Sequence, residues 1–170
     1  MSDFKKIPVQ EINGNVFEMI GSDWMLITAG DKQKANAMTA SWGGFGVMWN
    51  SSVAYIVIRP QRYTKEFVDA NETFSLSFFS SEYKSALGYL GSVSGRDEDK
   101  LTKSKLTLEY DDGTPYFGEA SLVLLCRKLF AQPLDPGSFT DPALPEKIYP
   151  NKDFHTLYVA KITKALQRQF

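Results

Sequence analysis

Segments of strand length separated by short turns occupy most of this chain, and they constrain its fold more than any other feature. Residues 53–58 are a continuous apolar run, and residues 24–29 are apolar except for Thr28. Residues 73–79 alternate hydroxyl and apolar side chains with period two. Helical spacing of apolar residues is confined to short stretches such as 83–90, and no regular strand–helix–strand alternation appears. The pattern predicts a mainly β fold with short helices (an α+β chain) that forms a closed or partly closed barrel.

The length of 170 residues suits one domain with its own core, so we expect a single domain over residues 1–170. Residues 1–12 precede the first apolar pattern, and we expect them to form a loosely ordered N-terminal arm. Five prolines lie between Pro133 and Pro150. They predict an extended surface excursion, of a kind suited to reach a partner subunit.

Composition argues against several classes of protein. The net charge is −1 and no basic run is present, so we expect neither a nucleic-acid partner nor an anionic membrane surface. A single cysteine, Cys126, permits no intrachain disulfide and fits a reducing compartment. No signal-peptide pattern and no apolar run of about 20 residues is seen, so we expect a cytoplasmic protein. With one histidine and one cysteine, no metal site is expected.

A strand-to-helix junction carries the clearest functional signal. Arg59, Arg62 and Thr64 follow the apolar run 53–58 and precede residues 67–70, which can continue as a helix. The start of a helix offers free backbone N–H groups and a positive dipole end, and arginine adds bidentate geometry for phosphate oxygens. The junction predicts a phosphate site.

The chain is poor in catalytic side chains. It has no Walker-type loop, no dinucleotide fingerprint and no G-x-S-x-G elbow, and a serine triad would have to rest on His155 alone. A protein equipped for phosphate but not for ordinary hydrolysis is most easily explained when a cofactor supplies the reactive atoms.

A second constellation lies at 36–44, where small polar residues alternate with small apolar ones before an indole. On a strand, Thr39 and Ser41 point to one face, and Ala40 and Trp42 point to the other. Hydroxyls and exposed backbone amides suit the polar edge of a heterocycle, and small side chains let a ring lie close to the strand. The glycines at 43, 44 and 46 permit unusual dihedrals or close approach to a ligand.

Together these segments resemble the flavin reductase-like, FMN-binding split-barrel family, especially its flavoredoxin-like branch. The resemblance rests on residues 36–44 (NAMTASWGG), 59–64 (RPQRYT) and 74–79 (FSLSFF), with a further match at 94–100. It extends from about residue 13 to about residue 164, and the order of the segments makes it specific.

The resemblance implies an FMN-binding split β-barrel, with noncovalent FMN near the interface of a homodimer. By position in the matching segments, it implies ring-edge and ribityl contacts from Thr39, Ala40, Ser41 and Trp42. It implies phosphate contacts from Arg59, Arg62 and Thr64. Ser77 matches a strand that approaches the flavin, and Arg96 and Lys100 are further charge partners. FMN is favoured over FAD because no feature suits an adenylate.

Many members carry Gly-Asp-His near the last strand, with the histidine beside the nicotinamide. Here the stretch is Asp153-Phe154-His155, so the spacing is altered, and NAD(P)H as co-substrate is less firmly implied than FMN. The leading hypothesis is an oxidoreductase, an NAD(P)H-dependent flavin reductase-like enzyme that passes electrons through FMN to an acceptor. The alternatives are a flavoredoxin-type carrier reduced by a redox partner protein, and a non-catalytic flavin-binding module.

Each residue also has a structural interpretation. Arg59 and Arg62 seen alone could be a solvated pair at a strand end, and Thr39 and Ser41 seen alone could be ordinary strand residues. His155 could be a hydrogen-bonded strand histidine. The combination of segments, rather than any one residue, favours the flavin hypothesis.

Overall fold

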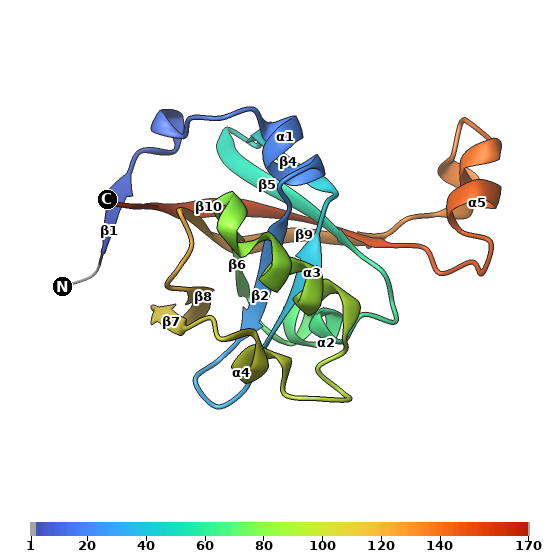
Figure 1. Cartoon of the computed structure of the whole chain (residues 1–170). Helices are drawn as coiled ribbons and strands as arrows, with labels where there is room; N and C mark the ends of the chain where they lie inside the picture. Colours follow the sequence, from blue (N-terminus) through green and yellow to red (C-terminus); the bar gives the residue numbers. More distant parts are fainter. Residues whose placement is uncertain (1–2, 170) are drawn as a thin grey trace.

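The computed structural model describes residues 3–169. Its centre is an antiparallel sheet in the order β3–β2–β6–β9–β10–β5–β4, with β1 paired to the end of β10. The strands are β1 (Phe4–Ile7), β2 (Met25–Gly30), β3 (Ala35–Ala40), β4 (Gly43–Met48), β5 (Ser51–Ile58), β6 (Thr73–Phe78), β9 (Leu122–Pro133) and β10 (Thr156–Arg168). Within the described residues β3 and β4 are the path's two ends, so the sheet stays open as a split barrel, as the sequence predicts (Figure 1).

Short helices and one small hairpin surround this sheet. They are η1 (Val9–Glu11), α1 (Val16–Gly21), α2 (Tyr63–Ala70), η2 (Ser81–Tyr83), α3 (Lys84–Ser92), α4 (Lys100–Ser104), η3 (Pro136–Ser138), α5 (Ala143–Ile148) and the hairpin β7 (Leu108–Asp111)–β8 (Thr114–Phe117). Helix α2 buries Thr64, Phe67 and Val68, whose spacing places them on one face against the sheet.

Strand β2 is buried on both faces because it separates two cores. Met25, Ile27 and Ala29 contribute to the core inside the barrel, while Leu26 contributes to a smaller core beneath α3. Its sequence, apolar except for the buried Thr28, is the pattern expected of a strand that faces no solvent.

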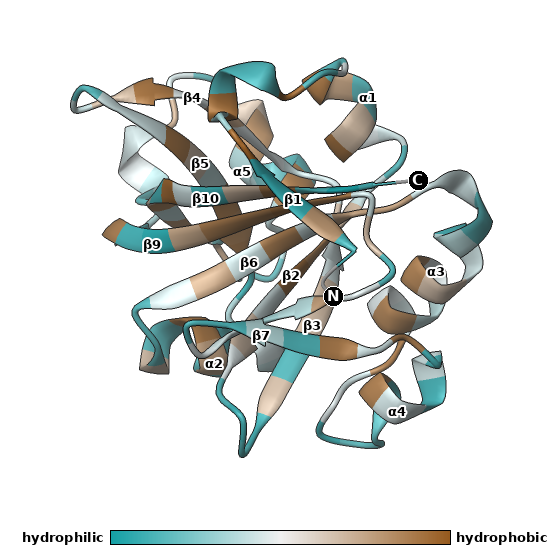
Figure 2. Ribbon diagram, turned by 90° about the vertical axis from the view of Figure 1, so that its left-hand side faces the viewer, coloured by the Kyte–Doolittle hydropathy of each residue, from teal (hydrophilic) through white to brown (hydrophobic). Residues whose placement is uncertain are grey.

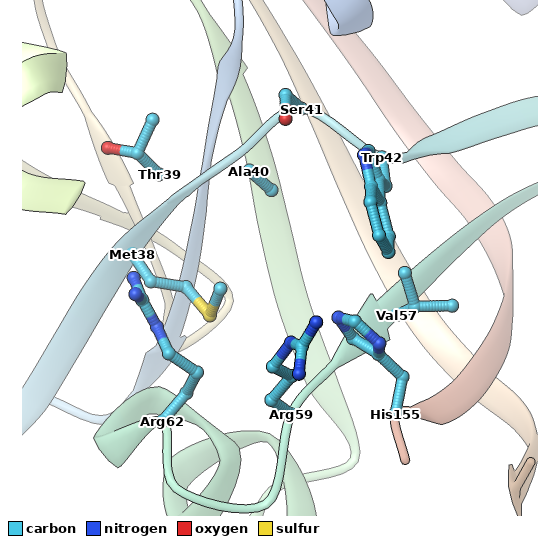
Figure 3. Close-up of a pocket in the computed structure, with 9 residues that line it drawn as sticks. All are labelled: Met38, Thr39, Ala40, Ser41, Trp42, Val57, Arg59, Arg62 and His155. Carbon is cyan, nitrogen blue, oxygen red and sulfur yellow. The ribbon is translucent and has the colours of Figure 1, made fainter. Parts of the chain in front are cut away.

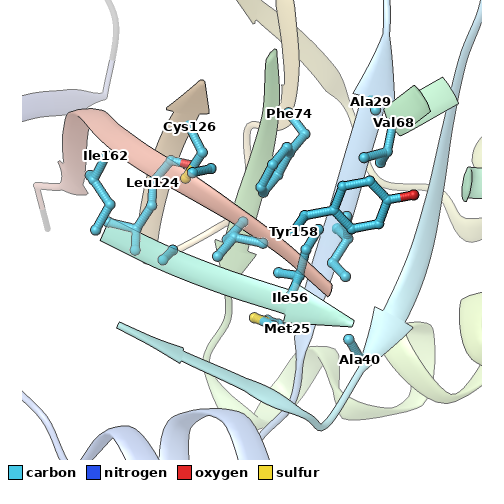
Figure 4. Packing of buried hydrophobic residues seen from close by; sticks show 14 of the residues in the cluster. Met25, Ala29, Ala40, Ile56, Val68, Phe74, Leu124, Cys126, Tyr158 and Ile162 are labelled. Atoms are coloured by element: carbon cyan, nitrogen blue, oxygen red, sulfur yellow. The ribbon is translucent and has the colours of Figure 1, made fainter. Parts of the chain in front are cut away.

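The inner core is built from alternate residues of the central strands. Phe74, Leu76 and Phe78 of β6 all point into it, as the period-two pattern predicts. Tyr158 of β10 is fully buried there (Figure 4). Its hydroxyl donates a 2.5 Å hydrogen bond to Asp69 Oδ1. Burying such large side chains contributes about 1.5–3 kcal/mol each to folding.

The second core holds α3 against β3. Leu87 and Leu90 of α3 pack with Leu26, Ala37 and Phe117. Helix α3 is also hydrogen-bonded to the edge strand, because Thr39 Oγ1 donates to the Leu87 carbonyl at 2.5 Å. The backbone of β3 is thereby fixed in place, which matters for the site below.

The glycine-rich segment after β3 is a strand, β4, and not an irregular loop. Gly43 adopts a φ of +144°, where other residues are strained. A Cβ atom at Gly43 would lie 2.7 Å from the Tyr55 carbonyl, and one at Gly44 would meet the Tyr55 ring. The close approach that these glycines permit is to Tyr55 on the neighbouring strand.

Two further segments differ from their sequence-based expectations. Residues 4–7, expected within a loosely ordered arm, pair with β10 as β1; residues 1 and 2 lie outside the described range. The proline-rich segment that follows β9 was expected to be an extended surface excursion. It projects from the end of the barrel opposite β1, but it contains the helix α5 (Figure 1).

Hydrophobic residues gather on the central strands and polar ones in the connecting loops (Figure 2). Among residues 3–169 there is no helix of the length and apolarity needed to cross a membrane.

Candidate functional site

Two adjoining cavities lie where β3, the loop between β5 and α2, and the start of β10 come together. The larger, here called the edge cavity, has a volume of about 280 Å³ (Figure 3). It is lined by Met38, Thr39, Ala40, Ser41, Trp42, Val57, Arg59, Arg62 and His155. Six of the residues that the sequence singled out for a flavin and its phosphate thus share one cavity with the predicted histidine.

The outer edge of β3 forms one wall of this cavity. Within residues 3–169, β3 is paired along one side with β2, and its other side is an end of the sheet. An unpaired strand edge presents a row of backbone N–H and C=O groups. Such a row can meet a planar ligand whose rim alternates hydrogen-bond donors and acceptors, and the small side chain of Ala40 leaves room for it.

The smaller cavity, here called the cation cavity, has a volume of about 160 Å³ and shares Met38 and Arg62 with the edge cavity. Its other lining residues are Asn36, Gln61, Tyr63, Thr64, Gly91, Ser92, Val93, Ser94 and Lys100. Hydroxyl, amide and cationic groups therefore converge here from β3, α2 and the end of α3.

Two cations face each other across the cation cavity. Lys100 is 3% exposed, and its Nζ donates hydrogen bonds to the carbonyls of Leu90 (2.9 Å) and Val93 (3.1 Å). Arg62 Nη1 donates to the Gly91 carbonyl at 3.4 Å. Within the described residues neither forms an ion pair with a carboxylate. An ammonium group has three donors, so Lys100 retains one for a further partner.

Burial makes this pair of cations costly. Burial, together with the nearby positive charge of Arg62, lowers the pKa of Lys100 to about 8. Burial also lowers the pKa of the Arg62 guanidinium. Buried charges are normally compensated. An anion in the cation cavity would supply that compensation.

Thr64 adds a neutral donor at the first turn of α2. Asn36 Nδ2 donates to Thr64 Oγ1 at 2.8 Å, and a hydroxyl that accepts a hydrogen bond keeps its own proton for another acceptor. Gly95 makes this arrangement possible, since a Cβ atom there would collide with the Asn36 side chain. The positive end of α2 points its free N–H groups to the same region.

Arg59 is engaged differently from Arg62, although both were predicted as phosphate ligands. Its Nη1 pairs with Asp153 Oδ2 at 2.5 Å, and its Nη2 donates to the Ile148 carbonyl at 3.0 Å. Gln61 Nε2 donates to the same Asp153 oxygen at 2.9 Å. Arg59 therefore fastens the segment after α5 to the barrel while lining the edge cavity.

His155 lies at the opposite end of the edge cavity from Arg62. Its ring sits beneath the Trp42 indole, with 5.1 Å between ring centroids and an interplanar angle of 42° (Figure 3). Burial and the charge of Arg59 lower the pKa of His155 to about 4, with Asp153 acting in the opposite sense. The imidazole is thus neutral near pH 7.

Two predicted residues lie outside both cavities. Ser77 is fully buried in β6, between Leu26 and Val123 of the neighbouring strands. Arg96 pairs with Glu66 and lies over the Tyr63 ring, 4.7 Å from its centroid.

Sequence reasoning missed several lining residues. They include Asn36, Met38, Val57, Ser92 and Ser94. Asn36 and Met38 stand inside the segment 36–44 that drew attention, and a buried asparagine on a strand is itself a signal. Ser92 and Ser94 reach the site through the path of the loop after α3, which no local pattern reveals.

The donor set fits a phosphate joined to a planar, hydrogen-bonding ring system. At one end, the buried Lys100 and the half-buried Arg62 lack a compensating carboxylate in residues 3–169, and at the other end lies an open strand edge. Phosphate suits the first, and the rim of a flavin suits the second. The lining residues of the edge cavity include no serine–histidine–acid arrangement with which the chain itself could carry out covalent catalysis.

Comparison with known proteins shows the family of this chain. The family model described as a flavin reductase like domain matches residues 18–169. The comparison with curated proteins gave no match.

Several solved structures share the fold. A flavoredoxin from Methanosarcina acetivorans is 26% identical, with a TM-score of 0.68 over 94% of this chain and 75% of its own. An FMN-binding domain of a flavin reductases-like enzyme from Shewanella baltica is 16% identical, with a TM-score of 0.68 over 97% of this chain and 77% of its own. An NADH:FAD oxidoreductase from Streptomyces globisporus is 15% identical, with a TM-score of 0.65 over 86% and 75%.

Proposed function

We propose, starting from the fact that the chain belongs to the flavin reductase-like family, that it binds FMN noncovalently and carries electrons from a reduced nicotinamide to an acceptor. The family and the structural neighbours support a flavin-binding redox function. One observation carries the assignment of FMN to this site: the buried Lys100 and the half-buried Arg62, neither with a carboxylate partner in residues 3–169, lie beside the open edge of β3.

The phosphate belongs in the cation cavity. Arg62 supplies a fork of donors, Lys100 its remaining ammonium proton, and Thr64 its hydroxyl proton. Charge-assisted hydrogen bonds of this kind are about twice as strong as neutral ones. The absence of carboxylates from the lining residues means that nothing there repels a dianion. Arg62 also borders the edge cavity, so a phosphate held there places the rest of the cofactor along β3.

The ring belongs in the edge cavity. The outer edge of β3 at Thr39 to Ser41 offers backbone donors and acceptors to its polar rim, and Trp42 and His155 close the far end. When bound, FMN would supply the hydride and single-electron chemistry for which the side chains have no equivalent. The chain contributes binding, orientation and exclusion of water.

The nicotinamide is the less strongly supported half of the proposal. It is supported by the NADH:FAD oxidoreductase among the structural neighbours and by a neutral His155 at the ring end. A second candidate is an electron carrier reduced by another protein. The neighbour that favours it is the Methanosarcina flavoredoxin, at 26% identity.

A homodimer is the third part of the proposal. An apolar face, here called the β4–β5 face, is formed by Val47, Met48, Trp49, Tyr55 and Phe130 around a hollow of about 510 Å³. Val47 is 82% exposed and Trp49 52% exposed. Large exposed apolar patches on one chain commonly mark interfaces. A second copy covering this face would lie next to the edge cavity, since Tyr55 and Val57 share β5.

Anaerobic mixing of the purified protein with FMN and then with NADH tests the proposal. Tight FMN binding followed by rapid loss of the yellow flavin absorbance is expected. Light scattering on the same sample should give the mass of two chains. A matched measurement with riboflavin, which lacks the phosphate, should show much weaker binding.

The outcomes separate the candidates. Bleaching by dithionite or a partner protein, but not by NADH or NADPH, would support the carrier. FMN binding without any productive reductant would leave a non-catalytic flavin-binding module. Equal affinity for FMN and riboflavin would overturn the assignment of the phosphate to the cation cavity.

A further inference from the structure

A buried hydrogen bond joins the segment after α5 to the wall of the edge cavity. The Tyr149 hydroxyl lies 2.7 Å from His155 Nδ1, and the two rings meet edge to face at 77°. Both residues are nearly buried, at 6% and 7% exposure. Tyr149 directly follows α5, so the projecting segment supplies a polar contact to a residue that lines the cavity.

Counting protons decides how this bond is made. A neutral imidazole carries one N–H, at Nδ1 or at Nε2. If the tyrosine donates to Nδ1, its only proton is used and the imidazole proton resides on Nε2. If Nδ1–H donates instead, the tyrosine proton must find another acceptor, and the other partner of Tyr149 Oη in residues 3–169 is the backbone N–H of His155, which is itself a donor. Buried polar groups are seldom left unpaired, so the first arrangement is favoured.

The surroundings keep His155 uncharged. Arg59, from the loop after β5, faces the ring and disfavours a second positive charge. Asp153 precedes β10 and favours protonation, but its Oδ2 is committed to Arg59 and Gln61. Burial raises the pKa of Tyr149, so the hydroxyl keeps its proton. A neutral N–H donor suits an uncharged carbonyl oxygen better than a phosphate.

The same groups hold the pair in place. The Arg59 guanidinium stacks over the Tyr149 ring, with 5.1 Å between its central carbon and the ring centroid. Arg59 also donates a hydrogen bond to the Ile148 carbonyl and pairs with Asp153. The Trp42 indole packs against the imidazole, with 5.1 Å between the ring centroids. With Nδ1 taken by Tyr149, Nε2 is the ring nitrogen left for the cavity.

We propose that Tyr149 is a positioning residue that fixes His155 as its Nε2–H tautomer, so that His155 donates one hydrogen bond to a carbonyl oxygen of a ligand in the edge cavity. This inference rests on the proposed function, since the ligand shares the cavity with the flavin ring. The carbonyl belongs either to the carboxamide of a nicotinamide or to a small carbonyl substrate. The donor requirement is the same for both.

The tautomer can be read directly because His155 is the only histidine of the chain. Long-range proton–nitrogen NMR of the wild-type protein with FMN should show an unprotonated Nδ1 and a protonated Nε2, unchanged from pH 6 to 8. A protonated Nδ1 in that spectrum would overturn the proposal. Tyr149→Phe should convert the signals to a mixture of tautomers, and Tyr83→Phe, a control on η2, should leave them unchanged.

Ligand additions identify the carbonyl. NADH and a small aromatic aldehyde are added separately to the FMN complex, and the Nε2–H resonance is followed. A shift with either ligand identifies the source of the carbonyl, and a shift with neither overturns the donor role. In steady-state assays His155→Ala and Tyr149→Phe should raise the KM for the ligand that causes the shift about 3- to 10-fold, as expected for one lost neutral hydrogen bond. The fraction of protein occupied by FMN should stay the same.

The two levels of inference fail in distinguishable ways. The tautomer is also measurable in protein without FMN, so it stands even if the flavin assignment is wrong. If the wild-type protein does not bind FMN, the proposed function is wrong, but the tautomer assignment is unaffected. If Tyr149→Phe does not fold, the wild-type spectrum still decides the question.

Discussion

Arg59 and Arg62 lie three residues apart in the chain, yet they differ in the partners of their guanidinium groups. Arg59 is paired with Asp153 and a backbone carbonyl, so its charge is largely compensated within the chain. Arg62 has backbone carbonyl contact with Gly91 and faces Lys100 across the cation cavity. The first fastens the segment after α5, and the second leaves a positive field for a ligand.

The comparison teaches that charge compensation, more than proximity, identifies an anion site. Both arginines line the edge cavity. A guanidinium already bonded to a carboxylate adds little attraction for a second anion, whereas one without such a partner adds its full charge in a partly dry environment. The cavity is accordingly cationic at the Arg62 end and nearly neutral at the Arg59–His155 end.

The largest expected effect follows from removing the uncompensated charge. Arg62→Ala should weaken FMN binding by about 1.5–3 kcal/mol, or roughly 10- to 150-fold, because a charge-assisted hydrogen bond to phosphate is lost. Fluorescence titration of FMN measures the change. Arg127→Ala, on an exposed position of β9, is the control for loss of a positive charge. An affinity equal to the wild type would remove Arg62 from the phosphate site.

Arg59→Ala is the matched counterpart and should change FMN affinity by less than about 1 kcal/mol. Its effect should fall on the segment after α5, whose Asp153 and Ile148 contacts are broken. Hydrogen exchange in residues 134–155 should accelerate while the central strands stay protected. A loss of FMN affinity as large as that of Arg62→Ala would abolish the distinction between the two arginines.

The pH dependence of binding sharpens the same comparison. Burial and the nearby charge of Arg62 lower the pKa of Lys100 from 10.5 to about 8, and a bound phosphate must raise it again. Above pH 8 the empty protein has a neutral Lys100, so FMN binding requires proton uptake and Kd should rise by up to about tenfold per pH unit. The pKa of His155 is about 4, so no matching change is expected from the other end at neutral pH.

Two controls belong to that titration. Riboflavin should show little of this pH dependence because it has no phosphate, and Lys100→Met should remove it for FMN. In the protein without ligand, the unfolded chain binds the Lys100 proton more tightly than the folded one. Its free energy of unfolding should therefore rise between pH 8 and 10.5. A flat FMN affinity over that range would exclude Lys100 from the phosphate contacts.

Local pattern was enough to predict much of this fold. The alternation at Phe74, Leu76 and Phe78 identifies the inner face of β6, and the largely apolar sequence of β2 reflects its two cores. Helix α5 was missed because prolines suggested irregular chain. Pro142 stands at its N-cap and Pro145 in its first turn, where no backbone donor is lost.

The sequence predicts which residues line the candidate site better than it predicts which of their charges are compensated. The segments 36–44 and 59–64 do meet at one cavity, which follows from their places at a strand edge and a helix start. The partner of Arg59 lies 94 residues away in the chain, and no local pattern shows which carboxylate will neutralise which cation. Ser77 shows the same limit, since period two fixes which residues share a face but not what that face meets.

The smallest expected effect tests whether the site extends to β6. Ser77 is fully buried outside both cavities, and its hydroxyl has no hydrogen-bond partner among the described residues. Ser77→Ala should leave FMN affinity unchanged and make the free energy of unfolding higher by about 0–1 kcal/mol, because an unpaired buried hydroxyl is removed. FMN titration and denaturant unfolding measure these two quantities. Ser75→Ala is the comparison, because the Ser75 hydroxyl donates to the Pro115 carbonyl at 2.6 Å. Removing that hydroxyl should lower the free energy of unfolding. Weaker FMN binding in Ser77→Ala would mean that the ligand reaches β6, and the site would then have a third region beside its cationic and neutral ends.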